Sequence, residues 1–589
     1  MSFIETRLGA KVPQPAQVKK QSFWTGMSMT FVLLIAGVIS LFVVGLGNTG
    51  LFDVDEAIFA QASVEMMDSG DYVTPTYNGE PRYHKPPLIY WLQAFSMSIF
   101  GIGALGARLP SAICGIVTVF MFYNVVSQLS RSNRYALIGA SVLGFNLSFL
   151  MVARAAIADM VLNMFMLALT LMLVGNVLTY RRHAFPLIIA GFVMGLGLLA
   201  KGPIAAVVPG VIVLMVVLLR PQVGYNFRCA DPFVIVPAAF LGLIPWAVHL
   251  TKEKGFDFLR EFIMVHNIGR YTETMGNHSG HWHYYLVVLL IGFFPWVLFL
   301  PSAVTGRLST FWKDLRGDSP RDALPVIGFL WMVFVLVLFS FSATKLPHYV
   351  LFALPGAALL VADRLDKLAE KPLLGVNWLW MWPYMMAFAL LFLLLPYLPE
   401  FALRRGDLYM AVEPWLAAHG WTVPAITDAQ VLVVLRQKID WGVAPAMIGA
   451  IMLIGFSMSM IMMTRGMRQG AMVMAVTMWM SLMLTVMGVV PTVYAYMQEP
   501  LARIAQEIKQ VYNPDTDKVV FYSLHQPSVR FISGVPFVPK DSAASAVDVK
   551  AKRLMVVLEE EKLDSLNAQL GMGSKRECFG GYCLVKIGF

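Results

Sequence analysis

Residues 26–46 read GMSMTFVLLIAGVISLFVVGL, an apolar run long enough to cross a lipid bilayer as a helix. The segment before it is polar and carries Arg7, Lys11, Lys19 and Lys20, and no small-residue cleavage site follows the run. We interpret residues 1–25 as a cytoplasmic tail and the run as an uncleaved signal anchor. The sequence therefore predicts a membrane-inserted chain whose N-terminus lies in the cytoplasm.

The composition of the whole chain indicates the same class of protein. Of its 589 residues, 58% are hydrophobic and only 14% are charged, and the mean hydropathy is +0.66. A soluble domain has too little interior to bury that much apolar surface. The net charge of +9 comes from short basic runs between apolar segments. Such runs are typical of loops that set membrane topology, so we expect no nucleic-acid partner.

Thirteen apolar runs of spanning or near-spanning length follow one another along the chain. They lie at about 26–46, 104–127, 134–152, 160–180, 184–200, 203–219, 232–250, 284–303, 324–341, 348–362, 375–396, 443–464 and 470–490. Alternate connections are basic, which places them in the cytoplasm by the positive-inside rule. We therefore predict thirteen transmembrane helices in a catalytic domain at 26–490, with the C-terminus outside.

Three segments on the predicted outer side are too long to be simple turns, namely 47–103, 251–283 and 397–442. The first contains two amphipathic stretches, which we expect to form helices in the membrane interface. Residues 491–589 alternate strand-like and helical patterns, so we predict a small periplasmic α/β domain. Cys578 and Cys583 lie close together and are able to form a disulfide in an extracytoplasmic tail.

Nearly every polar residue suited to chemistry falls on the outer side in this topology. Ionisable groups near a bilayer are costly, and several on one face predict a site or a pathway. These residues are Asp53, Asp55, Glu56, Lys85, Asp159, Lys201, His266, Arg270 and Lys345.

Each of these residues also has a structural interpretation. Asp53 and Glu56 have the spacing of a capping box, whereas Asp55 does not cap and is suited to accept a proton. Lys85 would either extend to lipid phosphates or bind a phosphate leaving group. Asp159 would either stabilise a helix N-terminus or belong to the site.

The remaining polar residues also have both a functional and a structural interpretation. His266 and Arg270 are four residues apart on one helical face, and arginine suits bidentate phosphate contacts. Their structural alternative is a surface cation. Lys201 lies in a tight hairpin, and FSATKLPHYVLFALP carries Lys345 and further polar residues. The histidines of HSGHWH lack a metal-binding signature, and no nucleotide-binding loop is present, so we expect no metal and no cofactor.

Six motifs in order resemble the bacterial lipid-linked-sugar glycosyltransferases of the glycosyltransferase C fold. Between about residues 50 and 360 these are DVDEAIFAQASVEMMDSGDYVTPTYNGEPRYHKPPLIYW, ARAAIADM, GLGLLAKGPIAAVVPG, PWAVHLTKEKGFDF with VHNIGRY, HWHYYL with FFPW, and FSATKLPHYVLFALP. That family includes transferases that add aminoarabinose to lipid A and, more distantly, protein O-mannosyltransferases. Where the aminoarabinose enzymes have Glu-Lys-Pro, this chain has His84, Lys85 and Pro86, so the sugar and the acceptor stay open.

The resemblance implies a role for each candidate residue. Catalysis would fall to Asp55, Glu56 and Asp159, and donor-phosphate binding to Lys85 and Arg270. The substrate cavity would be lined by Tyr83, His84, Lys201, His266, Lys345 and Tyr349.

We therefore expect a monomeric, multi-pass enzyme of the bacterial inner membrane with a periplasmic active site. It would transfer a sugar from a polyprenyl (undecaprenyl) phosphate to lipid A, another glycan or lipid, or a protein. Besides its substrates, it would contact only membrane lipids. The main alternative is a lipid or solute transporter without covalent chemistry, which would place ionisable residues at mid-span. A second alternative is an envelope scaffold whose tail binds a partner.

Overall fold

Long helices dominate the computed structural model, which describes residues 29–179, 184–220, 231–273, 280–317, 319–368, 370, 372, 376–397, 439–570 and 575–588. The predicted tail at 1–25 and most of the predicted outer segment at 397–442 lie outside these residues. Every one of the thirteen predicted apolar runs coincides with a helix or with a bent helix pair. The helices are α1 (Met29–Val43), α4 (Ala104–Ser130), α5 (Asn133–Gly144), α6 (Leu147–Ala153), α7 (Asp159–Thr179), α8 (Ala184–Lys201), α9 (Ile204–Leu219), α10 (Pro232–Lys254), α13 (Tyr284–Gly292), α14 (Leu300–Leu308), α16 (Pro320–Ser340), α17 (Leu354–Asp366), α18 (Val376–Leu394), α22 (Ala444–Thr464), α23 (Gln469–Leu484) and α24 (Val490–Met497).

Eight helices are long and apolar enough to cross a membrane, and the number is ten when each bent pair counts as one span. The first pair, α5 with α6, bends by 68°, and the second, α13 with η4 (Trp296–Phe299) and α14, bends by 112°. Three predicted runs form the shorter apolar helices α1, α8 and α9. The described residues therefore form a multi-pass membrane domain with eight to ten candidate spans, and the count of thirteen stays a prediction.

The first outer segment folds into two helices joined by a short hairpin. Helix α2 (Asp55–Ser69) buries Ile58, Phe59, Ala62 and Met66, the face that the sequence predicts. It ends at Gly70, whose φ of 71° is the left-handed conformation typical of a helix C-terminus. Strands β1 (Thr76–Tyr77) and β2 (Glu80–Pro81) then pair, and α3 (Leu88–Phe100) follows two prolines. Both predicted amphipathic stretches are thus confirmed as helices.

The C-terminal domain is a five-stranded mixed sheet with helices on both faces, which confirms the predicted α/β fold. Its strand order is β4-β3-β5-β7-β6, in which β3 runs parallel to β4 and β5, and the other pairs are antiparallel. The strands are β3 (Asp517–Tyr522), β4 (Phe537–Lys540), β5 (Arg553–Glu559), β6 (Lys575–Phe579) and β7 (Tyr582–Ile587). The helices are α25 (Glu499–Val511), α26 (Pro527–Ser533), α27 (Ala543–Val547) and α28 (Leu563–Leu570).

Alternating apolar residues along the strands give this sheet two cores. Val519 and Phe521 pack on the α25 side with Ile504, and Val520 packs on the other side with Leu566 of α28. Cys578 and Cys583 face each other across β6 and β7 and form a disulfide.

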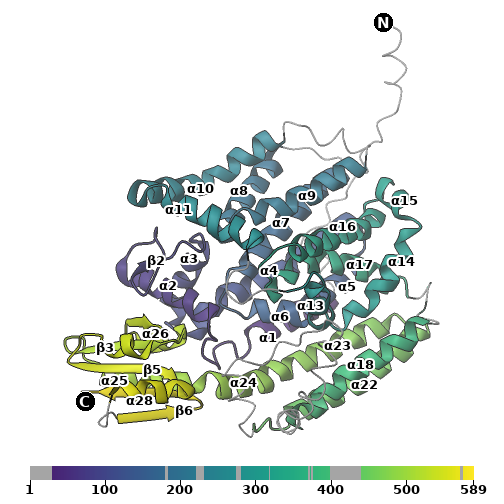
Figure 1. Cartoon of the computed structure of the whole chain (residues 1–589). Helices are drawn as coiled ribbons and strands as arrows, with labels where there is room; N and C mark the ends of the chain where they lie inside the picture. Colours follow the sequence, from purple (N-terminus) through teal and green to yellow (C-terminus); the bar gives the residue numbers. More distant parts are fainter. Residues whose placement is uncertain are drawn as a thin grey trace.

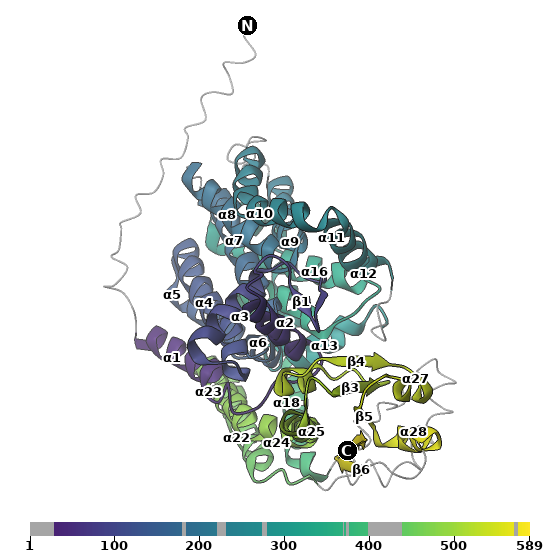
Figure 2. The same ribbon diagram turned by 90° about the vertical axis from the view of Figure 1, so that its left-hand side faces the viewer.

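The C-terminal domain lies against the first outer segment, although the two are far apart in the sequence. In Figure 1 the yellow helix α26 lies beside the purple helix α2. Figure 2 shows β4 next to β1, and two hydrogen bonds join Asn78 to Phe537 of β4 (2.8 and 3.2 Å). This contact brings residues of the tail close to the start of α2.

Candidate active site

A buried ion pair lies where α7 begins and α8 ends. Asp159 is the first residue of α7, Lys201 is the last of α8, and the two side chains form an ion pair. The Lys201 ammonium also lies 4.9 Å from the ring centre of Tyr349. His348 Nε2 is 3.6 Å from an Asp159 oxygen. Because an isolated charge is costly to bury, Asp159 and Lys201 each stabilise the other in the protein interior.

Two further ionisable residues lie near this pair. Asp55 is exposed at the start of α2, and Lys85 is buried just before α3. The charges of both act on His348, and the Lys85 charge also acts on Asp159. The structure therefore brings together five residues that the sequence predicts for the site, namely Asp55, Lys85, Asp159, Lys201 and Tyr349.

His348 belongs to the same group but is missing from the predicted site residues. It lies in the 3-10 helix η5 (Pro347–Ala353), directly before Tyr349. Its presence in the predicted hairpin, between two residues assigned to the cavity, was the signal that could have identified it.

Glu56 has a structural task in this geometry. Its carboxylate receives two hydrogen bonds from the Arg108 guanidinium (2.9 and 2.7 Å), one from the Phe52 amide (2.9 Å) and one from the Ala156 amide (2.7 Å). Both charged side chains are buried, with exposed fractions of 7% for Glu56 and 4% for Arg108. These four bonds occupy the carboxylate with protein groups, so a catalytic part for Glu56 stays a prediction.

Arg108 is the residue of this region that the sequence reasoning missed. Besides Glu56, its guanidinium donates to the carbonyl oxygens of Leu46, Thr49 and Gly50 and to the Thr49 hydroxyl. It thereby fixes the chain between α1 and α2. The available signal was an arginine inside an apolar run, which is rare unless it is paired.

The predicted capping box between Asp53 and Glu56 is wrong. Helix α2 starts one residue after Val54, and no side chain caps it. The Asp53 carboxylate instead accepts hydrogen bonds from the backbone N–H (2.7 Å) and the hydroxyl (2.5 Å) of Ser528 in α26. Burial raises the pKa of Asp53 to about 7, although the bonds from Ser528 act in the opposite direction.

The other predicted site residues either contact other parts of the chain or have side chains outside the described part. The Lys345 ammonium donates to the carbonyl oxygens of Ser340 (2.8 Å) and Ser342 (2.7 Å), where it completes the end of α16. The Tyr83 ring packs edge-on against Phe258, and His84 precedes Lys85. The backbones of His266 and Arg270 lie in η3 (Glu261–Gly269) and α12 (Arg270–Thr272), and their side chains lie outside the described part.

A second network of buried ion pairs lies away from the candidate site. Arg307 pairs with Asp314 and Asp363, and Arg321 pairs with Asp363 and Asp366. Arg307 and Arg321 fall in a predicted cytoplasmic loop, where they were expected only to set topology. Since these pairs are satisfied among themselves, the network joins α14, α15 (Phe311–Arg316), α16 and α17 at the opposite helix ends.

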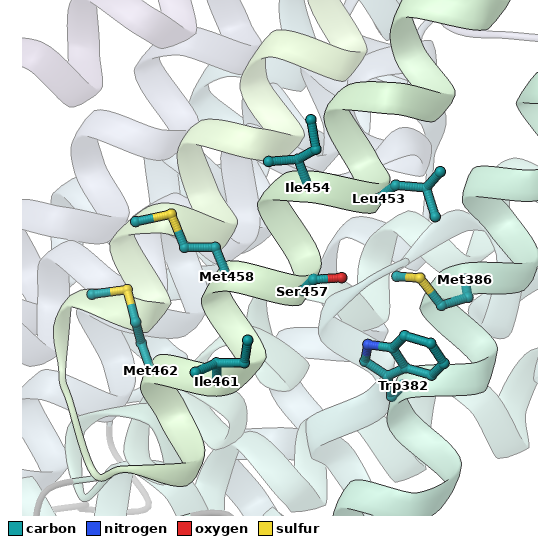
Figure 3. Close-up of a pocket in the computed structure, with 8 residues that line it drawn as sticks. All are labelled: Trp382, Met386, Leu453, Ile454, Ser457, Met458, Ile461 and Met462. Carbon is teal, nitrogen blue, oxygen red and sulfur yellow. The ribbon is translucent and has the colours of Figure 1, made fainter.

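An apolar groove lies apart from this site. It has a volume of about 570 Å³ and lies between α18 and α22 (Figure 3). Its lining residues are Trp382, Met386, Leu453, Ile454, Ser457, Met458, Ile461 and Met462. None of them belongs to the ionisable group. Among the described residues, no cluster of three or more His, Cys, Asp or Glu side chains could hold a metal ion.

The buried pair gives a prediction on stability. The variant Asp159→Asn leaves Lys201 buried without its counter-charge, so we expect the free energy of unfolding to fall by about 3 kcal/mol. The double variant D159N/K201M removes both charges and should recover most of this loss. Thermal unfolding in detergent measures both effects. A double variant no more stable than D159N would show that the pair is not what stabilises this position.

Comparisons with known proteins find similar glycosyltransferase sequences. Residues 84–251 match the sequence model of the family described as dolichyl-phosphate-mannose-protein mannosyltransferase. The undecaprenyl phosphate-alpha-4-amino-4-deoxy-L-arabinose arabinosyl transferase of Edwardsiella ictaluri is 28% identical over 358 residues, which cover 60% of this chain and 61% of that protein. The enzyme of the same name from Pseudomonas savastanoi is 31% identical over 339 residues, which cover 56% and 60%. The chain thus spans about three fifths of the length of these relatives.

A solved structure has the same fold over nearly the whole chain. It is that of ArnT from Cupriavidus metallidurans bound to undecaprenyl phosphate, with a TM-score of 0.70 and 20% sequence identity. The likeness covers 94% of this chain and 97% of that one. It therefore includes the membrane helices, the first outer segment and the C-terminal domain.

Proposed function

We propose that this chain is a polyprenyl-phosphate-dependent glycosyltransferase and transfers a sugar from a polyprenyl phosphate to an envelope acceptor. Its similarity to mannosyltransferase and aminoarabinose transferase sequences supports this proposal. The reaction would take place at the periplasmic face of the bacterial inner membrane. Lipid A, another glycan or lipid, and a protein are the acceptor classes.

One observation carries this proposal. The charges of an exposed carboxylate, Asp55, and of a buried lysine, Lys85, both act on His348, which lies beside the Asp159–Lys201 pair. A transfer from a sugar phosphate requires a cationic group at the leaving phosphate and a base at the attacking hydroxyl. This group of residues offers both within one small region.

The cationic end of the group suits the donor. Lys201 is neutralised by its ion pair with Asp159. Lys85, whose charge acts on both Asp159 and His348, is our candidate for the phosphate. The carbon–oxygen bond from the anomeric carbon to the phosphate breaks as polyprenyl phosphate departs. Lys85 stabilises the charge that develops on the leaving oxygen. Arg270, the other predicted phosphate ligand, stays a prediction.

The carboxylate end suits the acceptor. Asp55 is exposed and precedes the buried face of α2, so an acceptor hydroxyl is able to reach it. The acceptor oxygen forms the new bond to the anomeric carbon, and Asp55 takes the proton that this oxygen loses. The Asp159–Lys201 pair and His348 hold the wall of the site between the two ends.

The proposal is tested by transfer with the purified protein in lipid nanodiscs. The donor is undecaprenyl phosphate carrying a radiolabelled sugar, and the acceptors are lipids and glycans extracted from bacterial envelopes. We expect label to move from donor to acceptor. If label stays on every donor while the donor crosses the bilayer of a reconstituted vesicle, the protein is a transporter and the proposal is wrong.

The variant Lys85→Ala tests the donor end. Loss of one charged contact to a phosphate should lower kcat/KM for the donor by about 100-fold, because the contact acts in binding and in departure. Lys85→Arg should retain part of the activity. Lys252→Ala removes an exposed lysine of α10 and serves as the matched control. Equal kcat/KM values for the wild type and K85A would remove Lys85 from the site.

A further inference from the structure

The segment from Asp53 to Glu56 is fixed on its membrane side by one arginine. Arg108 binds Glu56 and the carbonyl oxygens that precede the segment, as described above. The Phe52 amide also donates a hydrogen bond to Glu56, which joins the two ends of this segment. The position of Glu56 is therefore set by the membrane domain.

The other end of the segment is fixed by the C-terminal domain. The side chain of Gln526, the N-cap residue of α26, makes no hydrogen bond to the first turn of that helix, so another group must accept the Ser528 N–H. Asp53 supplies the missing acceptor from the first outer segment, since its two oxygens accept the N–H and the hydroxyl of Ser528. Asp53, from a distant part of the same chain, thus accepts the hydrogen bond that an N-cap side chain normally accepts in its own helix.

Further contacts hold α26 on the helix that begins with Asp55. Arg530 of α26 lies 3.5 Å from a Glu65 oxygen. Glu65 also accepts the amides of Asn78 (2.8 Å) and Gly79 (3.1 Å). Phe531 packs against the same apolar cluster as Val64 and Met67 of α2. These contacts are spread along α2, so the attachment does not depend on the Asp53 bonds alone.

We propose that the C-terminal domain positions Asp55 to take the proton of the attacking acceptor hydroxyl, by holding Asp53 on Ser528 while Arg108 holds Glu56. Asp55 itself is exposed and lies between these two fixed carboxylates. Its backbone is therefore set from both sides although its side chain stays open to substrate. This inference rests on the proposed function, in which Asp55 takes the acceptor proton. Asp53 and Ser528 are positioning residues.

The reaction geometry gives this attachment its importance. A base must lie within hydrogen-bond distance of the proton that it accepts. A displacement of about 1 Å lowers the rate of such a reaction by about 100-fold. Loss of one of the two attachments should therefore reduce kcat more than it changes donor binding.

The charge state of Asp53 gives the attachment a pH dependence. The groups that act on this carboxyl are Ser528, Glu56, Tyr77 and Tyr494. The folded pKa of about 7 lies above the ordinary value of 3.8, so the folded chain binds the proton more tightly than the unfolded chain. Stability from this group is complete below pH 4 and is lost as the pH rises through 7.

Four variants test the proposal. Ser528→Ala and Asp53→Ala remove the side-chain contact, and we expect kcat to fall at least 10-fold with the KM for the lipid-linked donor within twofold of wild type. Asp53→Asn keeps both bonds, because its amide oxygen accepts the Ser528 N–H and its amide nitrogen donates to the hydroxyl. It should retain most of kcat. Ser542→Ala, which removes the serine that caps α27 in the same domain, should leave kcat unchanged.

The same variants overturn the proposal if they behave otherwise. Wild-type kcat in both S528A and D53A would show that the attachment does not position Asp55. A loss in D53N as large as in D53A would show that the hydrogen bonds are not the cause. The melting temperature of the wild type relative to D53N should fall between pH 5.5 and 8.5, and a constant difference would contradict the role of the Asp53 charge.

Hydrogen exchange separates this proposal from the proposed function. We expect the amides of residues 51–60 to exchange at least 10-fold faster in S528A and D53A, and at the wild-type rate in D53N and S542A. If the wild type transfers no sugar but the exchange rates change in this way, the function is wrong and the attachment is real. Unchanged exchange in all four variants overturns the attachment whatever the activity.

Discussion

Asp55→Asn is expected to lower kcat for sugar transfer by about 1000-fold. The amide has nearly the shape of the carboxylate but does not take up the proton that the acceptor hydroxyl loses, and general-base catalysis contributes about 100- to 10,000-fold. Donor binding should change little, because Asp55 lies at the acceptor end of the group. Measured values of kcat and of donor KM in the transfer assay test both parts.

The matched control for this variant lies on the same helix. Asp68 is an exposed aspartate near the end of α2, and Asp68→Asn should leave kcat within twofold of wild type. An Asp55→Asn enzyme with more than a tenth of wild-type kcat would show that another group accepts the proton. His348, which lies in the same group of residues, would then be the next candidate.

Arg108→Met is expected to cause the largest loss of stability, of about 3–5 kcal/mol. The change leaves the Glu56 carboxylate buried without its cation, and it leaves three carbonyl oxygens and one hydroxyl without their donor. The chain between α1 and α2 would lose its main attachment. Thermal unfolding in detergent, followed by size-exclusion chromatography, measures this effect.

Two further variants serve as controls for Arg108→Met. Arg503→Met breaks an exposed pair with Glu499 on α25 and should cost less than about 1 kcal/mol. Glu56→Gln combined with Arg108→Met removes both buried charges and should recover part of the loss. If R108M unfolds at the same temperature as R503M, the buried pair does not stabilise the fold.

The sequence predicted the features that local patterns encode. Every candidate span in the described part of the chain coincides with an apolar run of the sequence, and the apolar spacing in α2 identified its buried face. The outer position of Asp55, Lys85, Asp159 and Lys201 was enough to predict that they lie together, because the ends of neighbouring helices meet at one membrane surface. Tyr349 followed from the motif in the last outer hairpin.

Contacts between distant segments could not be predicted in the same way. The bond between Asp53 and Ser528 joins residues 475 positions apart, and no local pattern indicates such a partner. The capping-box spacing of Asp53 and Glu56 instead indicated a local contact. In the structure Asp53 binds Ser528 and Glu56 binds Arg108. The bends at 134–152 and 284–303 were missed because hydropathy reports the length of an apolar run and not its direction.

The attachment of Asp53 to Ser528 forms late in the biosynthesis of the protein. A ribosome makes the first outer segment early and α26 near the end, after the last candidate span, Gln469–Met497, has been made. The segment that carries Asp55 is therefore held on one side only while the remaining helices are inserted. Its second attachment forms only after the tail has been made and folded, so a chain whose translation stops inside the membrane domain never acquires it.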